Sequence, residues 1–196
     1  MGAHAAIMPP SLEVEDFLAF ADARPAGEKW ELIAGSLVLS PSPNRRHQII
    51  VGNVFSLIAD SRRKSAAAWE VLLGIGVKIS PKNAPVPDIL IRPFDDLQGA
   101  MCDDIIAAFE ILSPSTADHD LRWKRKVYAS LPTLQHYVII AQDDLDVIVY
   151  DRSTDFAERR IEKLDAALDL PALDLPALGL LLPLRDIYEN TGANAL

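Results

Sequence analysis

Apolar residues recur at helical spacing in three stretches of the chain. The first covers residues 12–21, where Ser11 is a suitable N-cap, and the second runs from about residue 44 to residue 64. The third, about residues 118–131, follows the turn-forming sequence Ser-Pro-Ser-Thr. The residues expected on the buried faces of the first two helices are Val14, Phe17, Leu18, Ala21, Ile50, Val54, Leu57 and Ile58.

Shorter apolar runs predict strands between and after these helices. One hairpin is expected from residues 30–33 and 36–39, joined at Ala34-Gly35, and a second from residues 136–141 and 146–150. The repeated sequence Leu-Asp-Leu-Pro-Ala near the C-terminus is expected in a surface loop. Further strands are expected at residues 69–79, with a bend at Gly74 and Gly76, and at 88–91, 105–112, 159–163 (an edge strand) and 180–184, before a terminal turn at 186–188.

The order of these elements predicts the fold class. A helix, a hairpin, a long helix, several strands, a helix and a second hairpin are typical of an α/β or α+β protein with a mixed sheet. No internal boundary stands out, so residues 1–196 are expected to form a single domain, with residues 1–10 as a flexible N-terminal segment. The sequence contains no P-loop, no dinucleotide fingerprint, no nucleophile elbow and no paired-cysteine zinc pattern.

Composition narrows the partners and the location. The formal net charge of −9 argues against general polyanion binding, so a nucleic-acid role requires local basic patches on an acidic body. Cys102 is the one cysteine, which fits a reducing compartment. The leucine-rich stretch 166–184 is interrupted by aspartates and prolines, which is not the pattern of a membrane span. We therefore expect a cytoplasmic protein without a membrane partner.

Three carboxylates lie in apolar surroundings. Asp88 begins a buried strand after Pro87, Glu110 lies near the end of an apolar run, and Glu31 lies inside the first hairpin. Buried carboxylates are costly, and neighbouring ones raise each other's pKa. A divalent cation relieves both problems, and it can polarise a phosphoryl oxygen and activate water. Lys124, on the third helix, is a candidate to orient that water or to stabilise the transition state.

Several strings, taken together in this order, resemble the Uma2 family (DUF820) of proposed endonucleases. The resemblance covers residues 12 to about 188. The strings are Trp30-Glu31-Leu32-Ile33-Ala34-Gly35, Ser40-Pro41-Ser42-Pro43, Arg46-His47-Gln48, Val86-Pro87-Asp88, Phe109-Glu110-Ile111-Leu112-Ser113-Pro114-Ser115-Thr116, and Asp120 with Lys124 and Tyr128.

The resemblance implies a restriction-endonuclease-like fold of the PD-(D/E)xK superfamily, with a central mixed β-sheet flanked by helices. It implies that Asp88 and Glu110 bind Mg²⁺ or Mn²⁺, with the Ile111 carbonyl as a third ligand and Glu31 as an auxiliary catalytic acid. DNA is the implied substrate. The superfamily places a lysine two residues after the second acid, and this position is Leu112 here. Some members supply the lysine from the following helix, where Lys124 would fill the catalytic role.

Simpler interpretations of the acids and of Lys124 stay open. Asp88 could cap a turn, Glu110 could lie on an exposed face, and Glu31 could pair with Lys29 or Lys78. Lys124 could be a surface residue that pairs with Asp120 at four-residue spacing.

The candidate nucleic-acid contacts and the assembly also have alternatives. The candidates Arg45, Arg46, His47 and Arg122 could be surface charges, and His47 could be structural. A homodimer is expected, with residues 136–150 and the apolar tail as candidate surfaces. The alternative function is a catalytically weak or inactive nuclease-fold module that binds nucleic acid or a protein.

Overall fold

The computed structural model describes residues 11–25, 27–96, 99–112, 119–162 and 172–193, without the side chains of residues 119–122 and 162. The expected N-terminal segment 1–10 and the first part of the leucine-rich stretch therefore lie outside the described residues. Within the described ranges, no helix combines the length and the apolar character needed to cross a bilayer.

A six-stranded sheet is the centre of the fold, with the strand order β10-β9-β8-β7-β5-β3. Strands β7 and β8 are parallel, and the other neighbours are antiparallel, so the mixed sheet expected from the sequence is confirmed. The strands are β3 (Trp69–Leu73), β5 (Ile89–Pro93), β7 (Ala107–Leu112), β8 (His136–Ala141), β9 (Asp146–Asp151) and β10 (Glu158–Glu162).

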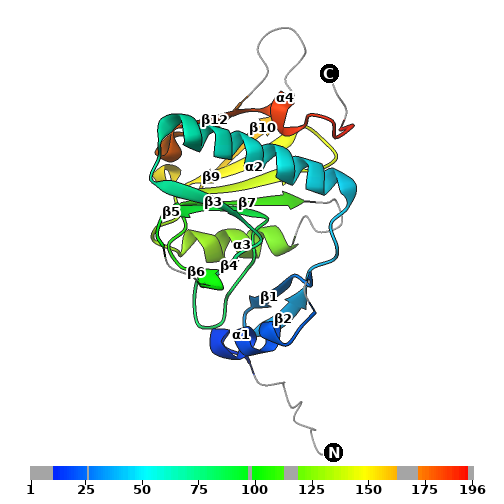
Figure 1. Ribbon diagram of the computed structural model, residues 1–196, viewed down its shortest axis with the longest axis vertical. Helices are drawn as coiled ribbons and strands as arrows, with labels where there is room; N and C mark the ends of the chain where they lie inside the picture. The colour runs from blue at the N-terminus through cyan, green and yellow to red at the C-terminus, as the bar shows by residue number, and fades with distance from the viewer. Residues whose placement is uncertain (1–10, 26, 97–98, 113–118, 163–171, 194–196) are drawn as a thin grey trace, which may run out of the picture.

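Two helices lie on opposite sides of this sheet, α2 (Arg45–Ser65) and α3 (His119–Ala129) (Figure 1). The side chain of Asn44 caps α2 by accepting a hydrogen bond from the backbone N–H of His47 at 2.9 Å. The sequence predicted this helix to within one residue, because its apolar stripe and its cap agree. Helix α3 follows residues 113–118, which lie outside the described part of the chain.

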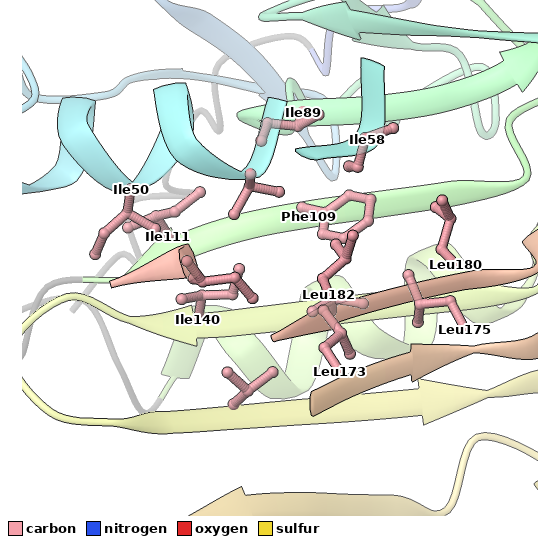
Figure 2. Packing of buried hydrophobic residues seen from close by; sticks show 14 of the residues in the cluster. Ile50, Ile58, Ile89, Phe109, Ile111, Ile140, Leu173, Leu175, Leu180 and Leu182 are labelled. Atoms are coloured by element: carbon pink, nitrogen blue, oxygen red, sulfur yellow. The ribbon is translucent and has the colours of Figure 1, made fainter. Parts of the chain in front are cut away.

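Alternating side chains of the strands divide the core into two layers. On one side, Ile50 and Ile58 of α2 pack over Ile89, Phe109 and Ile140 (Figure 2). On the other side, the α3 layer contains Leu90, Ala108, Tyr128, Tyr137 and Ile139. Because side chains alternate along a strand, the even-numbered residues 88, 90, 108 and 110 belong to the α3 side.

The hairpin of β11 (Ala172–Leu175) and β12 (Leu180–Pro183) corrects the expectation of a surface loop for residues 172–177, the part of the leucine-rich repeat that the structure describes. Its leucines alternate with exposed residues and complete the α2 layer (Figure 2). The pattern was hidden because two prolines interrupt it. A short 3₁₀ turn, Pro176–Leu178, joins the two strands, and α4 (Leu184–Ile187) follows.

The hairpin proposed as a dimer surface, residues 136–150, lies inside the sheet. Strand β8 lies between β7 and β9, and β10 pairs with the outer side of β9, so neither strand of this hairpin is an edge of the sheet, and its role in a dimer stays a prediction. In the apolar tail, the inward leucines belong to the core, while Leu181 stays 65% exposed. A turn of 3₁₀ helix, Arg152–Thr154, connects β9 to β10.

A small lobe beside the sheet contains α1 (Val14–Asp22) and the hairpin of β1 (Trp30–Ile33) and β2 (Ser36–Leu39) (Figure 1). The hairpin has the predicted residues, and its turn places Ala34 and Gly35 at positive φ, as a type I′ turn requires. Helix α1 begins at Val14, two residues later than expected, and its N-cap is Glu13 instead of Ser11. The N–H of Glu13 donates to the Asp16 carboxylate, so Ser11 is not the N-cap.

The segment 69–79 forms two strands instead of one. Gly74, at a φ of 61°, separates β3 from β4 (Gly76–Val77), which pairs in parallel with β6 (Met101–Cys102). A backbone bridge between Leu32 and Ala84 connects the β1–β2 hairpin to the loop that leads into β5. This loop and hairpin bring residues of the lobe to one end of the central sheet.

Candidate active site

Asp88 and Glu110 lie at the same end of two neighbouring antiparallel strands. Ile89 is paired with Phe109, so continuing the register by one residue sets Asp88 against Glu110 on the α3 side of the sheet. The Glu110 side chain is buried, at 4% exposure of the residue, which excludes the interpretation of Glu110 as an exposed charge. The two predicted metal-binding acids are therefore neighbours.

Glu31 reaches the same place from β1 of the small lobe. Its Oε1 accepts a hydrogen bond from the backbone N–H of Val86 at 2.8 Å, and its Oε2 accepts one from the Ser40 hydroxyl at 3.3 Å. The residue is 4% exposed. Two loops that are distant in sequence thus hold this carboxylate in one orientation.

Lys124 of α3 joins two of the acids. Its Nζ lies 3.0 Å from Glu31 Oε1 and 2.9 Å from Glu110 Oε1. The alternatives for Glu31 are thereby resolved, since Lys29 pairs with Asp88 and Lys78 pairs with Glu15. The helix after the second acid supplies a lysine to the site, in spite of Leu112 at the usual position.

Asp88 is surrounded by hydrogen-bond donors. Lys29 Nζ lies 2.8 Å from Oδ1, His47 Nε2 lies 3.5 Å from Oδ1, and the Ile111 N–H donates to Oδ2 at 2.8 Å. The carboxylate therefore bonds across to β7 instead of capping a local turn. Ile111 contacts the site through its N–H, while the metal-binding role of its carbonyl stays a prediction.

Burial and charge shift the pKa values of the acids in opposite directions. Burial alone would raise the pKa of Asp88, but the hydrogen bond from His47 and the charge of Lys29 outweigh it and hold this pKa below its ordinary value. Burial raises the pKa of Glu110 to about 7, against the opposing charge of Lys124 and with a further contribution from Asp88. At neutral pH, Asp88 is an anion and Glu110 is close to its midpoint.

Lys124 has a raised pKa. Its burial favours the neutral amine, but the charges of Glu110 and Glu31 outweigh this effect. Lys124 is therefore a fixed cation at neutral pH.

The candidate nucleic-acid contacts fall in different places. His47, in the first turn of α2, joins the site beside Asp88. Arg45 is exposed at the start of the same helix. Arg46 is engaged elsewhere, because it pairs with Asp143 and donates to the Thr191 carbonyl at 3.0 Å. Arg122 lies in α3, and its side chain is outside the described part.

Sequence reasoning missed the role of Lys29 and Ser40. Both flank the first hairpin, one residue outside its paired strands, and they point to different acids. The available signal was the position of Lys29 two residues before Glu31, which places both side chains on one face of an extended chain. The contact between Lys29 and Asp88 is evident only in the three-dimensional structure.

The acids offer the donor atoms that Mg²⁺ and Mn²⁺ prefer. Among the described residues, no group of three His, Cys, Asp or Glu side chains is arranged to hold a metal ion by itself. Mg²⁺ commonly binds one or two carboxylates and completes its shell with water and phosphate oxygens. The neighbouring pair of Asp88 and Glu110 fits this requirement, and the nearby lysines suit a phosphate.

Comparisons with known proteins agree with this fold. A model of the Uma2 family, described as "Putative restriction endonuclease", matches residues 14–183. The uncharacterized protein slr1290 of Synechocystis sp. is 24% identical over 161 residues, which cover 79% of this chain and 82% of that protein. A crystal structure of "a putative nuclease belonging to DUF820" from Anabaena variabilis superposes with a TM-score of 0.70 at 19% identity, covering 90% of this chain and 97% of that chain. The expected fold class is thus confirmed.

Proposed function

We propose, since this chain belongs to the Uma2 family, that it is a metal-dependent endonuclease that hydrolyses phosphodiester bonds in DNA. One observation carries the proposal: Glu31, Asp88 and Glu110 converge from three strands or strand ends, together with Lys124 and Lys29. Acids that bind a divalent cation and lysines that stabilise phosphate charge are the groups that phosphodiester hydrolysis needs.

In the proposed mechanism, Asp88, Glu110 and the Ile111 carbonyl would hold Mg²⁺ or Mn²⁺, and Glu31 would be an auxiliary acid. The bound cation supplies Lewis-acid polarisation of the phosphate and a lower pKa for its water. Lys29, His47 and the Ile111 N–H fix the Asp88 carboxylate in place. Ser40 and Val86 do the same for Glu31.

Lys124 acts as a cation and not as a general base, because its raised pKa keeps it protonated. Its ammonium lies between Glu31 and Glu110, where it can hold the attacking water and balance the charge that develops on the phosphate. Arg45, His47, Arg46 and Arg122 are the proposed contacts to the DNA backbone. Arg46 would need to leave Asp143 to take part.

Cleavage of supercoiled plasmid DNA tests the proposal directly. We expect purified protein to convert the plasmid to nicked or linear forms with Mg²⁺ or Mn²⁺, and to lose this activity in EDTA. Asp88→Asn and Glu110→Gln should lower the rate by at least about 100-fold. Lys124→Gln should lower the rate while Mn²⁺ binding, measured by calorimetry, persists.

Asp60→Asn is the matched control, because Asp60 is an exposed carboxylate on α2 that pairs with Arg63. It should cleave like the wild type. Equal cleavage by wild type and Asp88→Asn would assign the activity to a contaminant and contradict the proposal.

A second candidate function is a nuclease-fold module that binds nucleic acid or a protein without turnover. Two observations favour it: Leu112 replaces the usual lysine, and the carboxylates of the site are already paired with Lys29 or Lys124. This candidate predicts DNA binding in a gel-shift assay with no strand breaks in any metal. Breaks that disappear in Glu110→Gln would exclude it.

We also propose a homodimer that acts in the cytoplasm. A two-fold dimer would place one active site on each strand of a duplex, so that both strands could be cut in one encounter. The single cysteine fits a reducing compartment. Sedimentation at several protein concentrations tests the dimer, and a monomer at all of them, with and without DNA, would contradict it.

A further inference from the structure

Two tyrosine hydroxyls beside the candidate active site are buried without a partner. Tyr128 and Tyr137 have no measurable exposure, and their hydroxyls form no hydrogen bond within the described part of the protein. Most buried polar groups are hydrogen-bonded, and an unsatisfied one is costly. Phenylalanine would fill the same space without this cost, so the two hydroxyls require an explanation.

Their positions place both tyrosines next to Glu110. Tyr128 follows Lys124 by four residues on α3, so it lies one turn along the same helix face. Tyr137 on β8 is paired with Ala108, two residues before Glu110 on the same side of β7. The two rings contact each other with centroids 4.8 Å apart, between the sheet and α3.

Burial and nearby negative charge keep both tyrosines protonated, so that their hydroxyls can donate hydrogen bonds. Burial raises the pKa of both well above the ordinary value, and the charge of Glu110 adds to the effect. Both hydroxyls therefore keep their protons at neutral pH. Among the residues that the structure describes, only Lys124 hydrogen-bonds the Glu110 carboxylate, through Oε1. The carboxylate thus has acceptor capacity left beside two unused donors.

We propose that Tyr128, Tyr137 and Glu110 together bind an internal water molecule, and that the tyrosines are positioning residues for the Glu110 carboxylate. The water accepts hydrogen bonds from the two phenols and donates one to the carboxylate. Buried waters typically make about three hydrogen bonds to otherwise unsatisfied groups, which is the number available here. The inference rests on the proposed function only where it concerns metal binding by Glu110.

The sign of a stability change tests the water site. Tyr128→Phe and Tyr137→Phe remove one hydroxyl each and keep the ring. If the hydroxyls bind the water, each variant should have a lower melting temperature than the wild type. A higher melting temperature would mean that the hydroxyls are unsatisfied in the folded protein, and it would overturn the proposal.

Tyr150→Phe is the matched control for metal binding. Tyr150 stacks on Tyr137 with centroids 6.0 Å apart, but its hydroxyl bonds Glu158 at 3.1 Å. We expect Tyr128→Phe and Tyr137→Phe to weaken Mn²⁺ binding in calorimetry by about 10-fold or more, as loss of groups that orient a ligand does, and Tyr150→Phe to leave it unchanged. Unchanged affinity in all three would overturn the positioning role.

A double variant separates this inference from the proposed function. The effect of Tyr128→Phe on the melting temperature should shrink when Glu110→Gln is already present, because the water then donates to a neutral amide oxygen, a weaker acceptor than the carboxylate. Additive effects would contradict coupling through Glu110. If the wild type binds no Mn²⁺, the proposed function fails, whereas the melting temperatures still decide whether the tyrosines act on Glu110.

Discussion

Glu110 and Asp88 are neighbours with opposite electrostatic situations. Asp88 accepts hydrogen bonds from His47 and the Ile111 N–H and lies beside the positive charge of Lys29. These interactions lower its pKa in spite of burial. Glu110 has Lys124 as its compensating charge, and burial raises its pKa to about 7. One acid is thus held as an anion, while the other depends on pH or on a further cation to carry its charge.

The raised pKa of Glu110 predicts a pH dependence of stability. Between its ordinary pKa of 4.5 and about 7, the folded state keeps a proton that the unfolded state has lost, so stability falls as pH rises through this window. Glu110→Gln removes this term. Its free energy of unfolding relative to wild type should rise from pH 5 to pH 8 by on the order of 2–3 kcal/mol and then level off.

Urea unfolding in EDTA at a series of pH values measures this difference. The exposed Asp60→Asn variant is the control, and its difference from wild type should not follow the same curve. A Glu110→Gln difference that is flat between pH 5 and pH 8 would show that the buried carboxylate titrates normally.

Residue types and apolar context predicted which acids lie together in the structure, but not their partners. Asp88, Glu110 and Glu31 were identifiable because carboxylates are rare inside apolar runs. Lys124 was identifiable from its helix after the second acid. Lys29 could not be assigned to Asp88, because this ion pair depends on how a hairpin 59 residues earlier in the chain docks onto the sheet.

At the level of elements, local signals fixed the boundaries wherever cap, turn and periodicity agreed. The first hairpin and α2 are such cases, with Ala34-Gly35 as the turn and Asn44 as the cap. Strand β12 was predicted, but β11 and its pairing with β12 were missed, because β11 has only four residues and a proline follows it. Such strands form only because the α2 layer offers an apolar surface to cover.

Replacing two glycines by alanine should change the stability of the protein in opposite directions. Gly35 has a φ of 78°, and a Cβ there would lie 2.0 Å from Ser11 Oγ, so Gly35→Ala should destabilise the protein by about 1–2 kcal/mol. Gly52 lies exposed within α2 with open space around it, so Gly52→Ala should stabilise by up to about 1 kcal/mol. Urea unfolding measures both, and a destabilising Gly52→Ala would contradict the exposed helical placement.

At the level of the whole molecule, the candidate site is also the joint between the small lobe and the central sheet. Lys29 to Asp88 and Lys124 to Glu31 are ion pairs between these two parts, and the Val86 N–H to Glu31 bond reinforces them. The sequence predicted the mixed sheet from the order of its helices and strands. It did not predict this docking, because non-local ion pairs leave no periodic pattern along the chain.

We therefore expect the lobe and the sheet to unfold in one cooperative transition, as a single domain of residues 1–196 would. Trp30 lies in β1, whereas Trp69 and Trp123 lie in β3 and α3, so a Trp69→Phe/Trp123→Phe variant reports the lobe alone by fluorescence. Its urea midpoint should coincide with that of far-UV circular dichroism.

Adding Lys124→Met to this variant removes a cation from two buried acids. The Trp30 transition should then move to a lower urea concentration than the dichroism transition. Lys126 is an exposed lysine on the same helix, and adding Lys126→Met should leave the two transitions together. Separate midpoints in the variant that retains Lys124 would mean that the lobe is an independent unit that the buried ion pairs do not hold to the sheet.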